Sequence, residues 1–377
     1  MVASAEKIMI ALSGGVDSAV AALLLKQQGY AVEALHMTNW EDDEAYCTAA
    51  RDFQDARAVC EELAIPLHRV NFSQAYRDQV FADFLREYAA GRTPNPDVLC
   101  NREIKFGLFL DYARRLGASR MATGHYARSA SEPTRLLRGR DAGKDQSYFL
   151  HAVAGKALAH CLFPLGELQK AQVRELATSS GLPVNNKRDS TGICFIGERP
   201  FREFLQGYLQ APEGRMLTPD GQDMGPHVGL MFYTRGQRQG LGIGGSAGHA
   251  GDAWYVAGKD AHHNVLTVVQ GRDHPALWDG ALVTGQPSWV AGEPAALSAE
   301  GELACTAKTR YRQQDARCRV TRRADASLSV EFEEPQWAVT PGQYAVFYRG
   351  DECLGGAVIE GTGAEAAQAP DRLAASA

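Results

Sequence analysis

The segment Ser13–Ser18 reads Ser-Gly-Gly-Val-Asp-Ser and directly follows the apolar run Ile8–Leu12. Glycines at the end of a buried strand let backbone N–H groups approach an anion closely, and the serine hydroxyls add further donors. The apolar pattern from Asp17 onward predicts a helix, whose N-terminal end favours a phosphate. The segment therefore predicts a cradle for nucleotide phosphates at a strand-to-helix turn.

The acidic residue of this segment distinguishes it from a Walker-type phosphate loop. A Walker loop carries a Lys after its last Gly, whereas here Val16 and Asp17 follow Gly15. A carboxylate at this place suits a Mg²⁺ ion carried on the phosphates. The pattern Ser-Gly-Gly-x-Asp-Ser resembles the pyrophosphate loop (PP-loop) of ATP pyrophosphatases, which cleave ATP between the α and β phosphates and leave AMP on an acceptor.

Two cysteines lie in settings that suit chemistry. Asp97 precedes Cys100 by three residues, and Cys100 is expected to open a helix over 103–116, where the helix dipole would stabilise a thiolate. Cys194 lies in a glycine-bracketed apolar segment, 190–197, after a polar loop. A buried structural thiol remains the alternative for each. The other cysteines, at 47, 60, 161, 305, 318 and 353, have no comparable local setting.

The composition indicates a cytoplasmic protein of two or three domains. The chain has 377 residues and 45% hydrophobic content. No stretch approaches the roughly 18 consecutive apolar residues of a membrane span, and no secretory signal is expected at the N-terminus. The eight cysteines form no C-x-x-C pair, which favours reduced thiols and argues against a zinc knuckle or an iron–sulfur site.

The formal net charge of −6 conceals two basic stretches. Residues 305–323 carry seven Lys or Arg against one Asp, and a second basic stretch runs over 128–144. One such run is usually a solvated face, but two beside a nucleotide site favour a polyanionic partner.

Strands alternating with helices predict parallel βαβ units in the first half of the chain. The nucleotide should then bind at the carboxyl ends of the strands, where Ser13–Ser18, Met37 and residues 123–125 emerge. After about residue 211, short alternating segments predict antiparallel β domains. The strands expected in the first half are 8–12, 32–37, 67–72 and 120–123, and the helices are 17–28, 49–64, 74–90 and 103–116; in the second half a strand is expected over 228–233, among others.

With these motifs in hand, the chain is similar to the tRNA-specific 2-thiouridylase family, whose members replace oxygen by sulfur at C2 of the wobble uridine. The resemblance covers about residues 7–360. It rests on motifs in family order: S-G-G-V-D-S at 13–18, N-P-D-x-x-C-N at 95–101, A-T-G-H-Y at 122–126, K-D-Q-S-Y-F-L at 144–150, S-T-G-I-C-F-I-G at 190–197, Y-T-x-G-Q-R-x-G-L-G-I-G-G at 233–245 and R-Y-R at 310–312.

The resemblance implies an α/β fold: a parallel-sheet PP-loop ATP pyrophosphatase domain followed by two small β-rich domains. The expected boundaries are 1–200 for the catalytic domain, 201–268 for the central domain, 269–362 for a β-barrel-like tRNA-contacting domain, and 363–377 for a disordered tail. It also implies ATP and Mg²⁺ as cofactors, with Asp17 as the possible metal contact and no permanently bound group. The implied partners are tRNA and a sulfur-donor protein carrying a persulfide, with no membrane, and the free protein is expected to be a monomer.

The resemblance also implies residue roles. Cys194 carries sulfur as a persulfide, and Cys100 resolves it, leaving a Cys100–Cys194 disulfide that a reductant resets. Asp97 manages a proton, and Asn95 helps to hold the flipped uridine. The implied ATP-binding residues are Ala11, Leu12, Ser13, Gly14, Gly15, Val16, Asp17, Ser18, Met37 and Gly124. The implied contacts with the target base or tRNA are Asn95, Pro96, Asp97, His125, Lys144, Asp145, Gln146, Arg310, Tyr311 and Gln343.

Two other functions remain open from the residues. A PP-loop enzyme could form an amide or amidine on a small metabolite, although the basic C-terminal strands and the two cysteines argue against it. A nucleotide-gated RNA-binding protein without turnover is the second alternative, and Asp97 beside Cys100 argues against that one.

Overall fold

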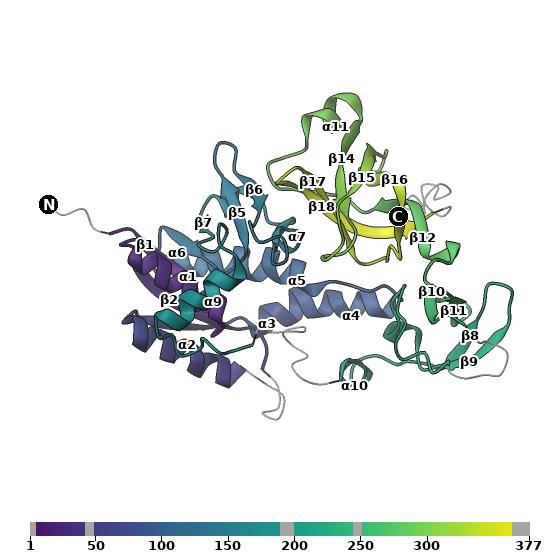
Figure 1. Ribbon diagram of the computed structural model, residues 1–377, viewed down its shortest axis with the longest axis horizontal. Coiled ribbons are helices and arrows are strands. Elements are labelled where there is room, and N and C mark those ends of the chain that lie inside the picture. The colour runs from purple at the N-terminus through teal and green to yellow at the C-terminus, as the bar shows by residue number, and fades with distance from the viewer. Residues whose placement is uncertain (1–4, 42–48, 189–199, 244–250, 364–377) are drawn as a thin grey trace.

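A five-stranded parallel sheet, in the order β3-β2-β1-β4-β7, forms the N-terminal part of the molecule (Figure 1). The computed structural model describes residues 5–41, 49–188, 200–243 and 251–363. The sheet was predicted from the βαβ pattern, and the prediction is confirmed. Its strands are β1 Lys7–Ala11, β2 Ala31–Thr38, β3 Leu67–Asn71, β4 Arg120–Ala122 and β7 Cys161–Leu162.

Helices cover both faces of this sheet, which explains why β1 is almost wholly apolar. Ile8 and Ile10 pack into the cluster formed with α1 Val16–Gln27, α2 Ala49–Leu63 and α9 Lys170–Ser179. Met9 points the opposite way, into a cluster built with the helix that ends in α6 Leu110–Arg115. The alternation of side chains along the strand therefore joins two apolar cores.

A long helical rod extends from the sheet toward the C-terminal half of the molecule (Figure 1). It consists of α3 Ser73–Tyr76, the π-helical η1 Arg77–Phe81 and α4 Ala82–Ala89 in direct succession. A second run beside it comprises α5 Pro96–Leu99, the π-helical η2 Cys100–Phe109 and α6. Shorter helices are α7 Ser147–Leu150, α8 Gly155–Leu158, α10 Phe201–Gln206 and α11 Ala295–Glu300.

The second run corrects the sequence-based start of its helix. Asn95, not Cys100, stands at the beginning: its side chain accepts a hydrogen bond from the Asp97 amide at 3.3 Å, and Pro96 occupies the first helical position. Proline is favoured there because its missing N–H has no helical partner in any case. Cys100 therefore lies beyond the first turn, where the helix dipole acts more weakly than predicted.

A four-stranded sheet, in the order β10-β11-β8-β9, follows the N-terminal part. Its strands are β8 Gly214–Leu217, β9 Asp223–His227, β10 Trp254–Asp260 and β11 Val265–Gln270. The strand predicted over 228–233 is wrong: a 3₁₀ turn, η3 Leu230–Phe232, stands there. Gly229 has φ +122°, which takes the chain out of the extended conformation directly after β9.

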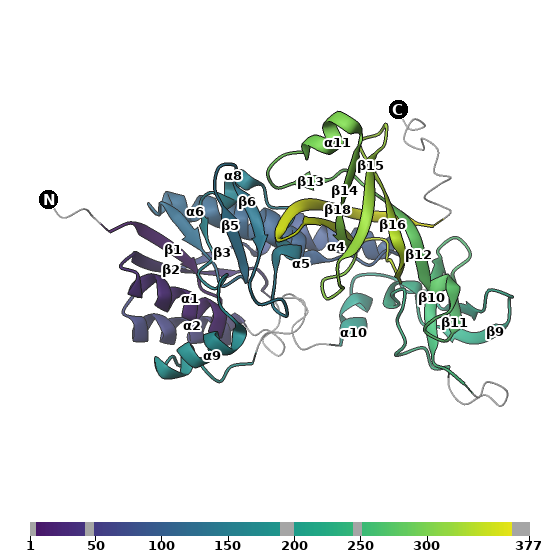
Figure 2. The ribbon, with the colours of Figure 1, turned by 45° about the horizontal axis from the view of Figure 1, so that its top comes forward.

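The C-terminal strands form a barrel in the order β12-β16-β15-β14-β17-β18, closed by pairing of β12 with β18. A hairpin from the first half of the chain, β5 Ala127–Ala130 and β6 Arg135–Arg138, adds to this sheet because β6 pairs with β18. The chain therefore leaves the parallel sheet after β4 and contributes this hairpin to the barrel sheet (Figure 2). The barrel strands are β12 Trp278–Thr284, β14 Glu302–Lys308, β15 Ala316–Arg322, β16 Leu328–Trp337, β17 Tyr344–Arg349 and β18 Glu352–Thr362, with the short β13 Ser288–Trp289 on β18 and the 3₁₀ turn η4 Pro275–Leu277 before β12.

No helix within the described ranges is long and apolar enough to cross a membrane.

Candidate active site

The segment Ser13–Ser18, called the loop below, follows β1 at the carboxyl end of the sheet and includes the first residues of α1, which begins at Val16. Ser18 Oγ accepts from the Ser13 amide at 3.2 Å and donates to the Gly15 carbonyl at 3.0 Å. Gly14 has φ +80°, and a Cβ there would lie 2.2 Å from the Asp52 carbonyl oxygen, so only glycine fits. Hydrogen bonds of Ser18 thus fix the conformation of the loop, and Ser13 is exposed to solvent.

The other predicted ATP contacts lie at the same edge. Met37 is near the end of β2, and Gly124 follows β4. A Cβ on Gly124 would lie 2.7 Å from the Ser18 amide nitrogen, so the bare backbone of Gly124 packs directly on the start of α1. The tertiary structure therefore brings the predicted loop, Met37 and Gly124 together.

Asp17 carries the only charge of the loop. Two side chains contact its carboxylate. Lys170 Nζ, from α9, lies 2.7 and 2.9 Å from its two carboxylate oxygens, and Tyr126 Oη donates to one of them at 2.8 Å. A carboxylate and an ammonium group at the start of α1 suit a Mg²⁺–phosphate ligand, because each can pair with one part of it.

The donor set fits a magnesium ion held mainly by phosphate oxygens. Among the described residues no cluster of three or more His, Cys, Asp or Glu could hold a metal ion. Mg²⁺ on nucleotides commonly takes one or two carboxylates and completes its shell with phosphate and water. Asp17 supplies one such carboxylate.

A second lysine supports the loop from outside. Lys187 Nζ donates to the Gly14 carbonyl at 3.0 Å and pairs with Asp52 at 2.7 Å and Asp55 at 2.5 Å, both on α2. These ion pairs raise the pKa of Lys187, although burial alone would lower it. Lys187 thereby fastens the loop to α2.

Cys100 is buried at the start of η2. Asn39, directly after β2, places its amide nitrogen 4.0 Å from the Cys100 sulfur. Asn39 Oδ1 and Asn101 Oδ1 are both buried without a hydrogen-bond partner among the described residues. Buried acceptors without a donor are costly, and such groups occur at functional sites where another molecule supplies the hydrogen bond.

Asp97 is exposed one turn before the thiol, yet protein atoms crowd its carboxylate. This desolvation raises the pKa of Asp97, and the charge of Lys105 opposes the rise only in part. A carboxyl group with a raised pKa is better able to give and take a proton near neutral pH.

Cys194 lies outside the described residues, so its distance from Cys100 is not part of this structure.

Residues of the barrel approach the segment around Cys100. Tyr311 packs its ring 4.4 Å from that of Phe149, and the Phe149 carbonyl accepts from Asn101 at 3.1 Å. Gln343 Nε2 donates to the Thr93 carbonyl at 2.8 Å, two residues before Asn95. Tyr311 and Gln343, two predicted residues of the barrel, thus contact residues that adjoin Asn95 and Cys100 in the fold although they are distant in the chain.

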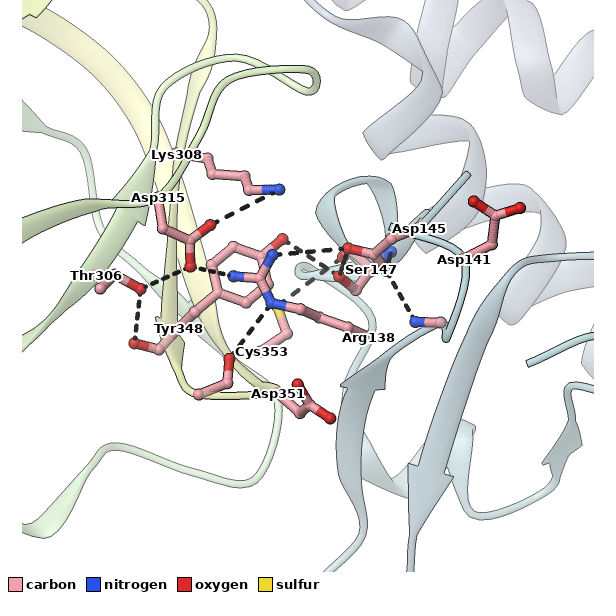
Figure 3. Close-up of polar contacts among 12 residues, drawn as sticks. Arg138, Asp141, Asp145, Ser147, Thr306, Lys308, Asp315, Tyr348, Asp351 and Cys353 are labelled. Atoms are coloured by element: carbon pink, nitrogen blue, oxygen red, sulfur yellow. Dashed lines mark hydrogen bonds and ion pairs between the residues drawn. The ribbon is translucent and has the colours of Figure 1, made fainter. Parts of the chain in front are cut away.

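Asp145 is a structural residue in this arrangement (Figure 3). It is buried, and its carboxylate accepts from the amides of Gly139 and Ser147 at 3.0 and 3.1 Å and from the Ser147 hydroxyl at 2.9 Å. Arg138 lies 3.9 Å away and also pairs with Asp315 of the barrel at 2.6 Å. These contacts hold the hairpin against the barrel.

The neighbours of Asp145 in the predicted tRNA set, Lys144 and Gln146, are both half-buried. The side chain of Gln146 accepts a hydrogen bond from the Tyr126 amide at 2.9 Å. His125 hydrogen bonds through Nδ1 with the Thr123 hydroxyl at 2.9 Å, and burial lowers its pKa well below the ordinary value, so the ring is neutral.

Arg310 points into the protein. Its Nη2 donates to the carbonyls of Arg235 and Ala338 at 2.7 and 2.8 Å and to Thr340 Oγ1 at 2.9 Å. Arg312, by contrast, is exposed. Within the 305–323 stretch, Lys308 pairs with Asp315, the one acid of the local count. Three further bases meet acids from outside the stretch, which that count left out: Arg317 with Glu333, Arg319 with Glu302 and Arg322 with Glu293.

Three family models match the chain in order. They are described as a tRNA methyl transferase HUP domain over residues 6–198, a tRNA methyl transferase PRC-barrel domain over 202–270 and an aminomethyltransferase β-barrel domain over 279–359. A tRNA-specific 2-thiouridylase MnmA of Cupriavidus metallidurans is 56% identical over 95% of this chain and all of that protein. The MnmA of Burkholderia pseudomallei is 56% identical over 94% of both chains.

The chain belongs to the tRNA-specific 2-thiouridylase family. Its fold is the α/β arrangement expected, a parallel HUP-type sheet followed by a PRC-barrel and a β-barrel domain. A solved 4-thiouridine synthetase–RNA complex with bound ATP is 19% identical over 54% of this chain and 50% of that one, with a TM-score of 0.35, a likeness too low to bear on function.

For this 2-thiouridylase family member, sequence reasoning missed several residues that build the site. Lys170 and Lys187 contact the loop from positions more than 150 residues away, and no local motif marks them. Asn39 and Tyr126 were also missed, although Asn39 ends an apolar strand and Tyr126 closes the A-T-G-H-Y motif. Polar residues at strand ends were the available signal.

Proposed function

We propose that this protein catalyses ATP-dependent 2-thiolation of the wobble uridine of tRNA. The products are 2-thiouridine, AMP and pyrophosphate. One observation carries the proposal: a buried thiol, Cys100, is tied through Asn39 to the same sheet edge that carries the loop Ser13–Ser18. β1 and β2 are adjacent parallel strands, so the groups at their carboxyl ends lie close together. A nucleotide bound at the loop and the thiol of Cys100 can therefore act on the same substrate.

The first step activates the uridine. Its C2 oxygen attacks the α-phosphorus of ATP, and pyrophosphate leaves into the cradle formed by the amides of Ser13–Ser18 and their hydroxyls. Lys170 neutralises charge on the departing phosphates, and Asp17 would hold a Mg²⁺ ion that would neutralise further charge on them. The remaining proposed ATP contacts are Ala11, Leu12, Met37 and Gly124.

Sulfur then replaces the activated oxygen. The terminal sulfur of a persulfide on Cys194 attacks C2, and AMP departs with the former C2 oxygen. The Cys100 thiolate attacks the sulfur–sulfur bond that remains, which leaves a Cys100–Cys194 disulfide, and a thiol reductant restores both cysteines. Asp97 takes and returns the proton, and Asn95 and Pro96 border the uridine.

The barrel side of the site binds the rest of the tRNA. The proposed contacts are His125, Lys144, Gln146, Tyr311 and Gln343, with Arg310 and Asp145 ordering the surface they belong to. A persulfide-carrying protein supplies the sulfur, and the enzyme acts as a monomer in the cytoplasm. The domains are proposed to divide at 1–200, 201–268 and 269–362, with the β5–β6 hairpin of the first joining the sheet of the third.

The test measures AMP, pyrophosphate and 2-thiouridine with and without tRNA and a persulfide donor. We expect AMP and pyrophosphate only when tRNA is present, and 2-thiouridine only when the donor is added. Release of AMP with a small carboxylate or ureido metabolite in place of tRNA would favour a synthetase. Tight tRNA binding without any AMP would favour a non-catalytic binding protein.

A further inference from the structure

The barrel contains a pair of cysteines that the proposed reaction does not use. Cys305 on β14 and Cys318 on β15 stand directly opposite each other in the antiparallel register, and their sulfur atoms lie 3.7 Å apart. No other thiol–thiol contact is found among the described cysteines. Cys60, Cys161 and Cys353 are buried, and Cys161 donates instead to the Ala157 carbonyl at 3.1 Å.

The backbone geometry of this pair suits a covalent bond. Directly opposed residues of an antiparallel pair have Cα atoms about 4.5–5.5 Å apart. A disulfide needs about 4.4–6.8 Å between its Cα atoms, so the strands can remain in register when the sulfurs close to bonding distance. Two side chains already in contact require only a small rotation about their Cα–Cβ bonds.

The two sulfurs differ in access, which sets the order of any reaction. Cys305 is half-buried, whereas Cys318 packs into the barrel core. The hydrogen bond with Cys305 and burial both raise the pKa of Cys318, so it is a poor thiolate while its partner is reduced. An oxidant therefore meets Cys305 first.

We propose that glutathione disulfide oxidises Cys305 and Cys318, which then form a disulfide with each other across the two strands. This bond restrains the hairpin that carries Arg310 and Tyr311. The Cys305 thiolate attacks glutathione disulfide and releases one glutathione thiolate. The Cys318 sulfur then attacks the mixed disulfide and releases the second. The two thiol protons of the protein pass to the two glutathione thiolates, so the protein loses two electrons and two protons and glutathione disulfide gains them.

The bond would restrain the connection between β14 and β15. That connection, residues 309–315, carries Arg310, which holds Arg235 and Ala338, and Tyr311, which packs on Phe149 beside Asn101. A fixed hairpin reaches its bound conformation at a lower entropic cost than a mobile one. The effect on tRNA rests on the proposed function, whereas the disulfide itself does not.

The chemical test uses the full chain in a Cys194→Ser background, so that the disulfide of the proposed reaction cannot form. The reduced protein is treated with glutathione disulfide, the remaining thiols are alkylated, and proteolytic peptides are weighed. We expect one cross-linked peptide joining Cys305 to Cys318, lighter by two hydrogen atoms than the separate peptides and absent after Cys305→Ser. Full alkylation of both cysteines, or a lasting glutathione adduct on Cys305, would overturn the proposal.

A second measurement tests this restraint. We expect the dissociation constant for tRNA to be about threefold lower for the oxidised protein than for the reduced protein. In Cys305→Ser, the same treatment should leave the dissociation constant unchanged. Equal constants for the two forms would exclude the restraint. If neither form binds tRNA, the proposed function fails, while the peptide result stands unaffected.

Discussion

At the residue scale, Asp17 shows how the site balances charge. Its carboxylate meets the Lys170 ammonium and the Tyr126 hydroxyl at the positive end of α1. In the proposed function, the nucleotide phosphates would pair with Lys170 and their magnesium ion with Asp17, so the two side chains that pair with each other here would each pair with one part of the ligand.

We expect Asp17→Asn to fold normally but to lose at least about 100-fold in tRNA-dependent release of pyrophosphate, because an amide cannot hold a metal ion as a carboxylate does. The measurement is a pyrophosphate release assay with saturating tRNA. Asp111→Asn, at an exposed position on α6, is the matched control and should keep full activity. A near wild-type rate in Asp17→Asn would exclude the metal-linked role.

Substitutions of the two cysteines of the proposed reaction should block different steps. Cys194→Ser should take up no persulfide from the donor. Cys100→Ser should load sulfur on Cys194 and then stall, accumulating a covalent tRNA–enzyme disulfide if the persulfide attacks the uridine directly. Intact-protein mass spectrometry with and without reductant distinguishes these states. Normal thiolation by both variants would exclude a two-cysteine mechanism.

At the scale of elements, the helix that starts at Pro96 places the thiol. Asn95 caps it, η2 holds Cys100 facing Asn39, and Asn101 binds the Phe149 carbonyl. The side chain of Asn95 also borders a cavity of about 260 Å³ between α4 and the barrel strands β17 and β18. Asn95 thus both caps the helix and lines this cavity.

We expect Asn95→Ala to lower the free energy of unfolding by about 1 kcal/mol, since the first-turn amides lose their cap. Asn95→Ser, which can still cap, should keep this stability. Urea unfolding followed by circular dichroism measures both variants. If Asn95 also contacts the uridine, Asn95→Ser will raise the KM for tRNA while remaining stable; an unchanged KM would leave Asn95 with capping alone.

The β14–β15 hairpin gives a second prediction at this scale. Replacing exposed Arg312 by Ala should flatten the logarithmic salt dependence of tRNA binding by roughly one unit per lost phosphate contact. Arg310→Ala should weaken binding and also lower the melting temperature, because its three internal hydrogen bonds are lost. Filter binding at several salt concentrations measures the salt dependence of tRNA affinity for both variants. If the logarithmic slope is unchanged in both, the stretch 305–323 does not contact tRNA phosphates and is an ordinary solvated surface.

At the scale of the whole molecule, the catalytic sheet and the barrel share a core. His151, between α7 and α8, contacts Tyr344 of β17 with ring centroids 4.9 Å apart, and its Nδ1 bonds to the Tyr148 carbonyl at 2.7 Å. The residue is 1% exposed. Its desolvation lowers the pKa to about 4, so the ring is neutral where the two parts meet.

Protonation of His151 should weaken the junction. Because its pKa is lower in the folded protein than the ordinary 6.5, the unfolded chain binds more protons between these values, and stability falls as pH drops from about 6.5 to about 4. This residue should account for about 3 kcal/mol of that fall.

The pH series compares urea unfolding of the wild type with His151→Asn. The variant should be less stable at pH 7 because packing is lost, but its stability should decline less between pH 6.5 and 4. His262→Asn changes an exposed histidine and should follow the wild type. Equal slopes for His151→Asn and the wild type would exclude His151 as the titrating group.

The sequence alone determined the local features of this protein. The loop Ser13–Ser18 and the parallel pairing of the first strands follow from short patterns, because glycine conformation and strand burial depend on near neighbours. The same locality explains the errors. The helix was expected to begin at Cys100, whereas Asn95 caps it and Pro96 is its first residue. The strand over 228–233 was expected from its apolar residues, but Gly229 has a positive φ and ends the extended conformation there.

Only the tertiary structure decided which distant residues meet. Lys170 and Lys187 reach the loop, the β5–β6 hairpin joins the barrel, and acids outside the basic stretch 305–323 pair with Arg317, Arg319 and Arg322. Each of these contacts depends on the path of the chain between its partners. Charge pairing and strand pairing act across space without leaving a periodic signal in sequence, so no local pattern could predict them.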